Sequence, residues 1–147
     1  EIIVVDPIAK IKSNTICYTA EKDKPISVNI AKHPQFISNE YIDGQGIFTF
    51  KNKITSIPEK AFFDCSKLDS IIIPESVTEI GNSVFTRCHY LKMVYCQSTT
   101  PPTLGENAFS NISREAKICV PKNSVALYKS ANGWKDYASK IVGCDFK

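Results

Sequence analysis

The stretch from Ile54 to Cys96 contains nearly the same pattern twice, and this repeat constrains the fold more than any other feature. The copies are "ITSIPEKAFFDCSKLDSIII" and "VTEIGNSVFTRCHYLKMVYC", offset by 23 residues (77 − 54). The positions that agree are apolar: Ile57 with Ile80, Phe62 with Phe85, and Leu68 with Leu91. A fixed period of this length predicts a solenoid, because one repeat cannot bury its own apolar face and must pack on its neighbours.

A looser third copy and a half-copy flank the two clear ones. The third copy is offset by 24 residues, and the half-copy precedes the first by 23. Their aligned apolar residues are Leu104, Ala108, Phe109, Ile118 and Val120 in the third copy, and Phe48 and Phe50 in the half-copy. We therefore expect the strand of the half-copy to lie directly beside the strand of the first full copy.

Two kinds of local pattern alternate within each copy. The motif L-x-x-I-x-I ends in alternating apolar residues, which predicts a short strand with one buried face. The segments "IPEKAFFDC" and "IGNSVFTRC" have apolar residues three to four apart, which predicts a single helical turn. Each copy has one phenylalanine at the same place, and we expect Phe62, Phe85 and Phe109 to stack in the core.

The repeat unit resembles a known family. "LDSIIIPESVTEIGNSVFTRC" is similar to the short leucine-rich repeats of bacterial surface proteins called BspA-like, whose unit is about L-x-x-I-x-I-P-x-S-V-T-x-I-G-x-x-A-F-x-x-C, with Val84 in place of Ala. The resemblance implies an α+β, β-rich fold, namely a short right-handed leucine-rich-repeat solenoid with a β-rich N-terminal cap and a helical C-terminal cap. It also implies an exported, cell-surface, non-enzymatic binding module implicated in adhesion, without cofactor or metal.

The chain reads as one domain, 1–147, in three sections. Residues 1–53 form the predicted β-rich cap, with one hairpin joining "NTICYTA" to "PISVNIA" and another turning at Asp43 and Gly44. Residues 54–121 hold the repeats. Residues 122–147 form the C-terminal cap, where Asn123 or Ser124 is predicted to N-cap a helix and Trp134 to cover the last repeat.

Composition excludes several classes of protein. The net charge of +3 is small and scattered, so nucleic acid is not an expected partner. No run approaches the ~18 apolar residues of a membrane span. The chain begins at Glu1 without a signal-peptide pattern, so we expect a processed form, and we expect a monomer.

The six cysteines leave one question open. None forms a C-x-x-C pair, which argues against zinc. Cys65, Cys88 and Cys96 stand at apolar repeat positions, so we expect them to be reduced and buried. The state of Cys17 and Cys144 is left undecided.

No motif indicates an enzyme. There is no glycine-rich phosphate loop, and no pattern brings His33 or His89 to a nucleophile. Acidic residues such as Glu75 and Glu79 fall at predicted solvent-facing positions, so we expect them to aid solubility and not to act as a catalytic acid–base pair.

One predicted surface stands out, because the side chains of a strand alternate between its two faces. The outward residues should form two rows: Thr49, Ile72, Tyr95 and Cys119 in one, and Ile47, Ser70, Met93 and Lys117 in the other. We take Thr49, Ser70, Ile72, Met93, Tyr95, Lys117 and Cys119 as candidate ligand-binding residues for a protein or glycan. The alternatives are that the N-terminal section covers them, that they are simply exposed, or that the chain is a structural spacer of a larger surface assembly.

Overall fold

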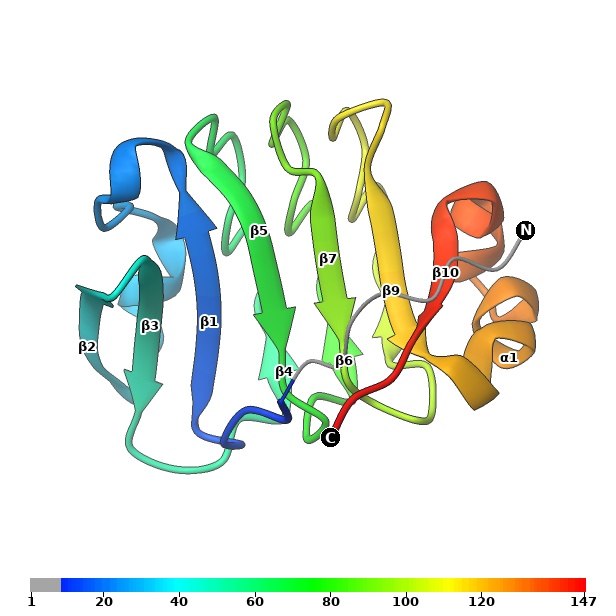
Figure 1. Cartoon of the computed structure of the whole chain (residues 1–147), viewed down its shortest axis with the longest axis horizontal. Coiled ribbons are helices and arrows are strands. Elements are labelled where there is room, and N and C mark those ends of the chain that lie inside the picture. The colour runs from blue at the N-terminus through cyan, green and yellow to red at the C-terminus, as the bar shows by residue number, and fades with distance from the viewer. Residues whose placement is uncertain (1–8) are drawn as a thin grey trace.

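The structure of the protein, a computed structural model, describes residues 9–147 (Figure 1). The first eight residues of the predicted N-terminal cap lie outside the described residues. The larger sheet has the order β10 (Ile141–Cys144), β9 (Lys117–Pro121), β7 (Met93–Cys96), β5 (Leu68–Ile73), β1 (Thr15–Ala20), β3 (Gln45–Phe50), β2 (Phe36–Ile42). The smaller sheet, behind it in Figure 1, contains β4 (Ser56–Ile57), β6 (Glu79–Ile80) and β8 (Thr103–Leu104). The helices are short: η1 (Glu21–Asp23), η2 (Asn29–Lys32), η3 (Lys122–Ser124), α1 (Val125–Ser130) and η4 (Trp134–Lys140).

Each full copy of the repeat contributes one strand to each sheet. In the larger sheet β5, β7 and β9 run parallel, with Ile71 opposite Val94 and Val94 opposite Ile118. In the smaller sheet β4, β6 and β8 also run parallel, with Ile80 between Ile57 and Leu104. These pairs are the ones aligned in the sequence at offsets of 23 and 24, so the predicted repeat register is confirmed.

The segments between the two strands of a repeat form turns, and the predicted helical turn is wrong. The N–H groups of Lys60 and Phe62 donate to the carbonyls of Asn82 and Val84 in the next repeat, both at 3.0 Å. A helix would direct these groups along its own chain. The backbone is left-handed at Lys60 and again at Ser83 (φ 59° and 55°), which turns alternate N–H groups toward the neighbouring repeat.

The predicted phenylalanine column is confirmed. Phe62, Phe85 and Phe109 are fully buried, and adjacent rings stack nearly parallel with centroids 5.4 Å apart. Phe48 of β3 packs on one end of the column at 5.8 Å, and Trp134 packs on Phe109 at 5.7 Å. Aromatic side chains therefore close both ends of the core, and Trp134 covers the last repeat as expected.

The N-terminal section differs from the prediction. Residues 25–31 form no strand with β1, and the first hairpin is absent from the described chain. Instead β1 is inserted between β3 and β5 and runs antiparallel to both (Figure 1). The second hairpin is confirmed, with β2 and β3 joined at Asp43 and Gly44, both with positive φ.

Two side chains of β1 explain its position. Ile16 and Tyr18 point into the core and are almost completely buried, and the Tyr18 ring stacks on Phe48 with centroids 4.8 Å apart. The Tyr18 hydroxyl donates to Asn39 Oδ1 at 2.6 Å, so its polar end is satisfied. The strand thus fills the core between the half-copy and the first full copy, and β3 does not lie beside β5 as we expected.

The C-terminal section contains one strand that the sequence did not reveal. Ser124 precedes α1 as predicted, but its hydroxyl donates to the carbonyl of Thr99 at 2.7 Å and makes no cap bond to the helix. Gly133, with φ 82°, separates α1 from η4. The chain then forms β10, which pairs in parallel with β9 and ends the sheet.

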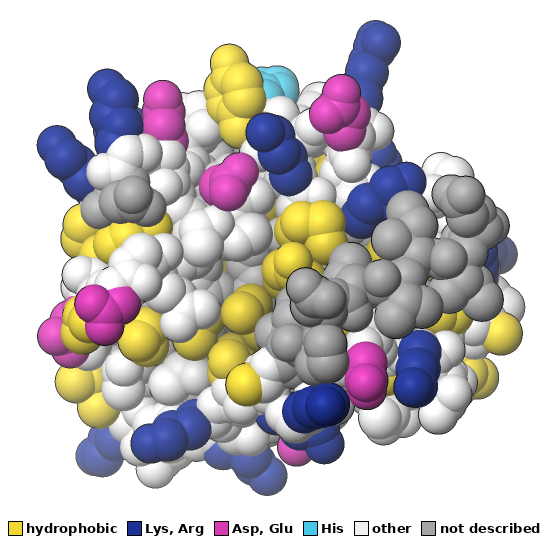
Figure 2. All heavy atoms as spheres, viewed as in Figure 1, with side chains coloured by type: hydrophobic (Ala, Val, Ile, Leu, Met, Phe, Trp, Pro, Cys, Tyr) yellow, Lys and Arg dark blue, Asp and Glu magenta, His cyan; other side chains and the backbone are white. Residues whose placement is uncertain are grey.

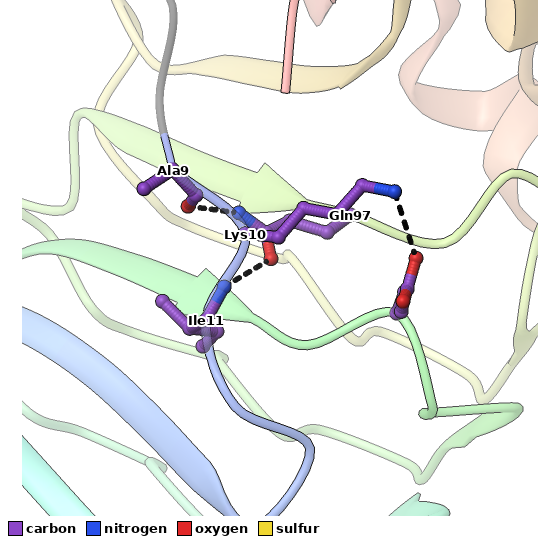
Figure 3. A network of polar contacts seen from close by, with 5 residues as sticks. Ala9, Lys10, Ile11 and Gln97 are labelled. Carbon is purple, nitrogen blue, oxygen red and sulfur yellow. Dashed lines mark hydrogen bonds and ion pairs between the residues drawn. The ribbon is translucent and has the colours of Figure 1, made fainter. Parts of the chain in front are cut away.

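The segment before β1 is fixed at the carboxyl end of β7 by Gln97 (Figure 3). The Gln97 Oε1 atom accepts the N–H of Ile11 at 3.0 Å, and Nε2 donates to the carbonyl of Ala9 at 2.9 Å. The N–H of Lys10 donates to the carbonyl of Lys147 at 2.6 Å. A single buried amide therefore holds residues 9–11 against the sheet, next to the last residue of the chain.

Candidate functional site

The outer face of the larger sheet, turned away from the core, carries one continuous row of mainly apolar side chains. We call this set the outer row. It consists of Ile47, Cys17, Ile72, Tyr95, Cys119 and Val142, which are consecutive partners in the strand register. A second row, two residues nearer the start of β5, β7 and β9, consists of Thr19, Ser70, Met93 and Lys117. Its one apolar member, Met93, is treated from here on as part of the outer row.

The structure brings most of the predicted site residues together and moves Thr49 away. Ile72, Tyr95 and Cys119 lie side by side, as do Ser70, Met93 and Lys117. Thr49 lies opposite Thr15, because β1 separates β3 from β5. Its expected place beside Ile72 was wrong.

The prediction missed two members of the outer row, Val142 on β10 and Cys17 on β1. Cys17 changes the row more. It lies between Ile47 and Ile72 in the register, so the row contains Ile47 where the sequence alignment placed Thr49. The available signal was the alternation in β1, where Ile16 and Tyr18 point inward and Cys17 outward. Which strands β1 would pair with could not be read from that alternation.

Parts of the outer row are more buried than expected. Ile72 is only 9% exposed, while Ile47, Met93 and Tyr95 are half-buried. Cys119 is completely buried and forms a disulfide with Cys144, so its prediction as an exposed ligand-binding residue was wrong. The physical reason is β10, which places Val142 and Cys144 against Cys119, and with Met93, Tyr95 and Phe146 they make a small second apolar cluster.

The remaining cysteines have no disulfide partner. Cys65, Cys88 and Cys96 are buried and free, as predicted, and Cys17 is free as well. Burial raises the pKa of Cys88 to about 12, and that of Cys96 to about 11. These thiols are protonated at neutral pH, so they are poor nucleophiles.

Polar groups border the outer row where β1, β5 and β7 meet. The hydroxyls of Thr19 and Ser70 lie 2.6 Å apart, and Thr19 Oγ1 donates to Asp69 Oδ2 at 3.2 Å. Burial raises the pKa of Tyr95, and the negative charge of Asp69 raises it further. The Tyr95 hydroxyl therefore stays protonated at neutral pH and can donate a hydrogen bond to a ligand.

The distribution of side chains on this face resembles that of a protein interface. Figure 2 shows hydrophobic side chains over the middle of the face and charged ones mostly around its edge. Interface cores are depleted in charge and enriched in Tyr and Met, while their rims are polar. The outer row with Met93, bordered by Ser70, Asp69 and Lys117, has this composition.

Two features are absent from the part of the chain that the structure describes, namely a cluster of metal-ligating side chains and a membrane-spanning helix. Residues 9–147 contain no group of three or more His, Cys, Asp or Glu side chains that could hold a metal ion. The same residues contain no helix long and apolar enough to cross a membrane.

Comparison with known proteins identifies the repeats. The family described as "BspA type Leucine rich repeat region (6 copies)" matches residues 36–132, well over half of the chain. No curated protein matches the chain. The matched region includes β2 to β9 and α1, which are the strands of every repeat copy and the helix behind the last one. The chain therefore belongs to the BspA-type leucine-rich-repeat family.

Proposed function

We propose that this chain is an exported binding module that holds a protein ligand on the outer row, and that it has no catalytic activity of its own. The observation that carries the proposal is the half-buried patch of Ile47, Met93 and Tyr95 on a sheet face that no helix of residues 9–147 covers. Partly exposed apolar side chains grouped on one face favour a partner.

The repeat architecture supports a binding role. Parallel strands stacked at a period of 23 to 24 residues fit a short right-handed solenoid, which we propose together with its β-rich N-terminal and helical C-terminal caps. We also propose that residues 1–147 act as one domain. Solenoids present extended surfaces of this kind for ligand binding.

Export is supported by the disulfide between Cys119 and Cys144. Disulfides persist in oxidising compartments and are rare where thiols are kept reduced. The Cα atoms of Cys119 and Cys144 lie 5.6 Å apart, within the range that a disulfide requires. With the family's association with bacterial surface proteins, this favours an extracellular or cell-surface location.

A pair of truncations tests the proposal. The chain would be screened against immobilised matrix proteins and glycans, and the affinity of any bound protein would be measured with Tyr95→Ala and Met93→Ala. We expect each variant to bind about fivefold to tenfold more weakly, which corresponds to ~1 kcal/mol or more for a contact residue at the centre of an interface. Leu127→Ala is the control, since Leu127 is an exposed apolar residue on α1, away from the outer row.

The result also separates binding from a structural role. If both variants bind every identified partner as tightly as the unmodified chain, the outer row is not the binding face. If no partner binds at all, the spacer interpretation takes its place. Circular dichroism of each variant would establish that the fold is intact.

A further inference from the structure

Tyr90 lies on a rim of the molecule that the outer row does not include. This rim is formed by the loops that precede β5, β7 and β9, and these loops lie side by side along the upper edge in Figure 1. Tyr90 is 65% exposed, and no other Phe, Tyr or Trp side chain of residues 9–147 is as exposed. The one tryptophan, Trp134, is fully buried.

The Tyr90 ring has no partner among the described residues. It makes no hydrogen bond, ring contact or cation–π contact with them, whereas Tyr18, Tyr41, Tyr128 and Tyr137 all pack on other rings. The equivalent positions in the neighbouring repeats hold Lys67 and Arg114, so the stacked core does not require an aromatic residue here. A single exposed aromatic side chain is common on protein surfaces, so the argument for a ligand at Tyr90 depends on the groups that surround the ring.

Tyr90 separates two open hollows in the rim. The first has a volume of about 400 Å³, and its walls include Glu21, Lys67, Asp69 and Lys92. The walls contain two carboxylates and two ammonium groups, so their formal charges balance. Neither lysine forms an ion pair with a described residue, which leaves both free to meet a ligand.

The second hollow, of about 500 Å³, lies on the other side of Tyr90. Its walls include His89, Asn111, Arg114 and Glu115. Lys140 approaches from η4, and its ammonium group donates to the carbonyl of Arg114 at 3.2 Å. The walls of the hollow combine an imidazole, an amide, a carboxylate and a guanidinium, with no large excess of one sign.

We propose that the rim binds a neutral oligosaccharide, with one pyranose ring stacked on Tyr90 and hydroxyl groups of its neighbours hydrogen-bonded in the two hollows. The negative face of an aromatic ring attracts the slightly positive C–H groups of a sugar face. Sugar hydroxyls both donate and accept, so they match walls that contain carboxylates, an amide and ammonium groups together.

The charge balance selects a neutral glycan over a sulfated or otherwise acidic one. A polyanion would be held by a surplus of Lys and Arg, and the two carboxylates of the first hollow would repel it. A peptide partner is disfavoured because tyrosine hot spots lie in apolar, desolvated surroundings, whereas both hollows beside Tyr90 are open and polar. This site shares Asp69 with the border of the outer row, but its central contact is Tyr90, and it does not depend on the proposed protein ligand.

The test uses a defined set of probes: cellohexaose, maltohexaose, mannohexaose and chitohexaose, with a heparin hexasaccharide as the acidic comparison. Saturation-transfer NMR would identify which probes bind, and calorimetry would give their affinities for the unmodified chain, Tyr90→Ala, Tyr90→Phe and two controls. Leu127→Ala and Ile37→Ala each remove an exposed apolar side chain that lies in neither proposed site.

We expect at least one neutral hexasaccharide to bind, about tenfold more weakly to Tyr90→Ala and within about threefold to Tyr90→Phe, because stacking needs the ring and not the hydroxyl. Both controls should bind normally, and Tyr90→Ala should unfold like the unmodified chain because Tyr90 is largely exposed. The proposal is overturned if no neutral probe binds, if only heparin binds, or if Tyr90→Ala binds sugar normally. Loss of a protein ligand alone in Tyr90→Ala would also overturn it.

Discussion

The substitution Phe85→Ala removes the central ring of the aromatic column. Phe85 has no exposed surface and lies between two parallel rings, each with its centroid 5.4 Å away. Truncating a buried phenylalanine to alanine costs ~3–5 kcal/mol through lost burial and the cavity left behind. Because two stacked contacts worth ~0.5–1.5 kcal/mol each are lost together, we expect a cost near the upper end of that range.

Urea denaturation followed by circular dichroism would measure this cost, with the disulfide intact. The matched control is Phe63→Ala, which makes the same chemical change at a residue that follows Phe62 in the sequence but lies outside the column. Phe63 is only half-buried, and its ring contacts the Lys60 ammonium at 5.5 Å, so we expect a loss of ~1 kcal/mol. Equal losses for Phe85→Ala and Phe63→Ala would refute the argument that the column carries the stability of the repeats.

Three further predictions follow from the same structure. Ser83→Asn should raise the free energy of unfolding by ~0.5–1 kcal/mol, because Ser83 has φ 55° and Asn tolerates a left-handed backbone better than Ser. The third repeat already has Asn107 at this position, with φ 57°. Ser66→Asn, at a position without a left-handed backbone, should give no gain. Raising the pH above 9 should destabilise the protein, because the Cys88 thiol loses its proton near pH 9 in the unfolded chain but only near pH 12 in the folded one. The urea midpoint should therefore fall more between pH 8 and pH 10 in the unmodified chain than in Cys88→Ala. Equal falls in the two proteins would contradict this. Trp134 fluorescence should be blue-shifted and resist acrylamide until unfolding, because the indole is buried and donates to the Pro102 carbonyl at 2.7 Å; a red, readily quenched emission from folded protein would contradict it.

The repeated part of the fold could be predicted from the sequence because its apolar positions recur at a fixed spacing. The alignment of Phe62 with Phe85 placed both rings in one column, and the alignment of Ile71 with Val94 gave the strand register. The free state of Cys65 and Cys88 followed from the same logic, since both occupy positions of the shared buried face.

The parts that escaped prediction depend on contacts that no local pattern records. The alternation in β1 predicts a strand, but its insertion beside β5 depends on how Ile16 and Tyr18 fill the core. The disulfide of Cys119 depends on β10, a strand of four residues that directly follows a helix. Those two strands decided which outward residues became neighbours, so only part of each predicted row lies where we expected it.

The central claim is that a ligand contacts the outer row, and one measurement tests it directly. Met93 is the single methionine of the sequence and lies next to Tyr95 in the second apolar cluster, so photo-methionine incorporation places one cross-linker on this face. The double variant Met93→Leu, Leu127→Met moves the same probe to α1 as a matched control. After irradiation with the bound protein ligand, mass spectrometry should find the cross-link at position 93 and none at position 127. A cross-link from position 127 alone, or equal yields from both positions, would contradict the account.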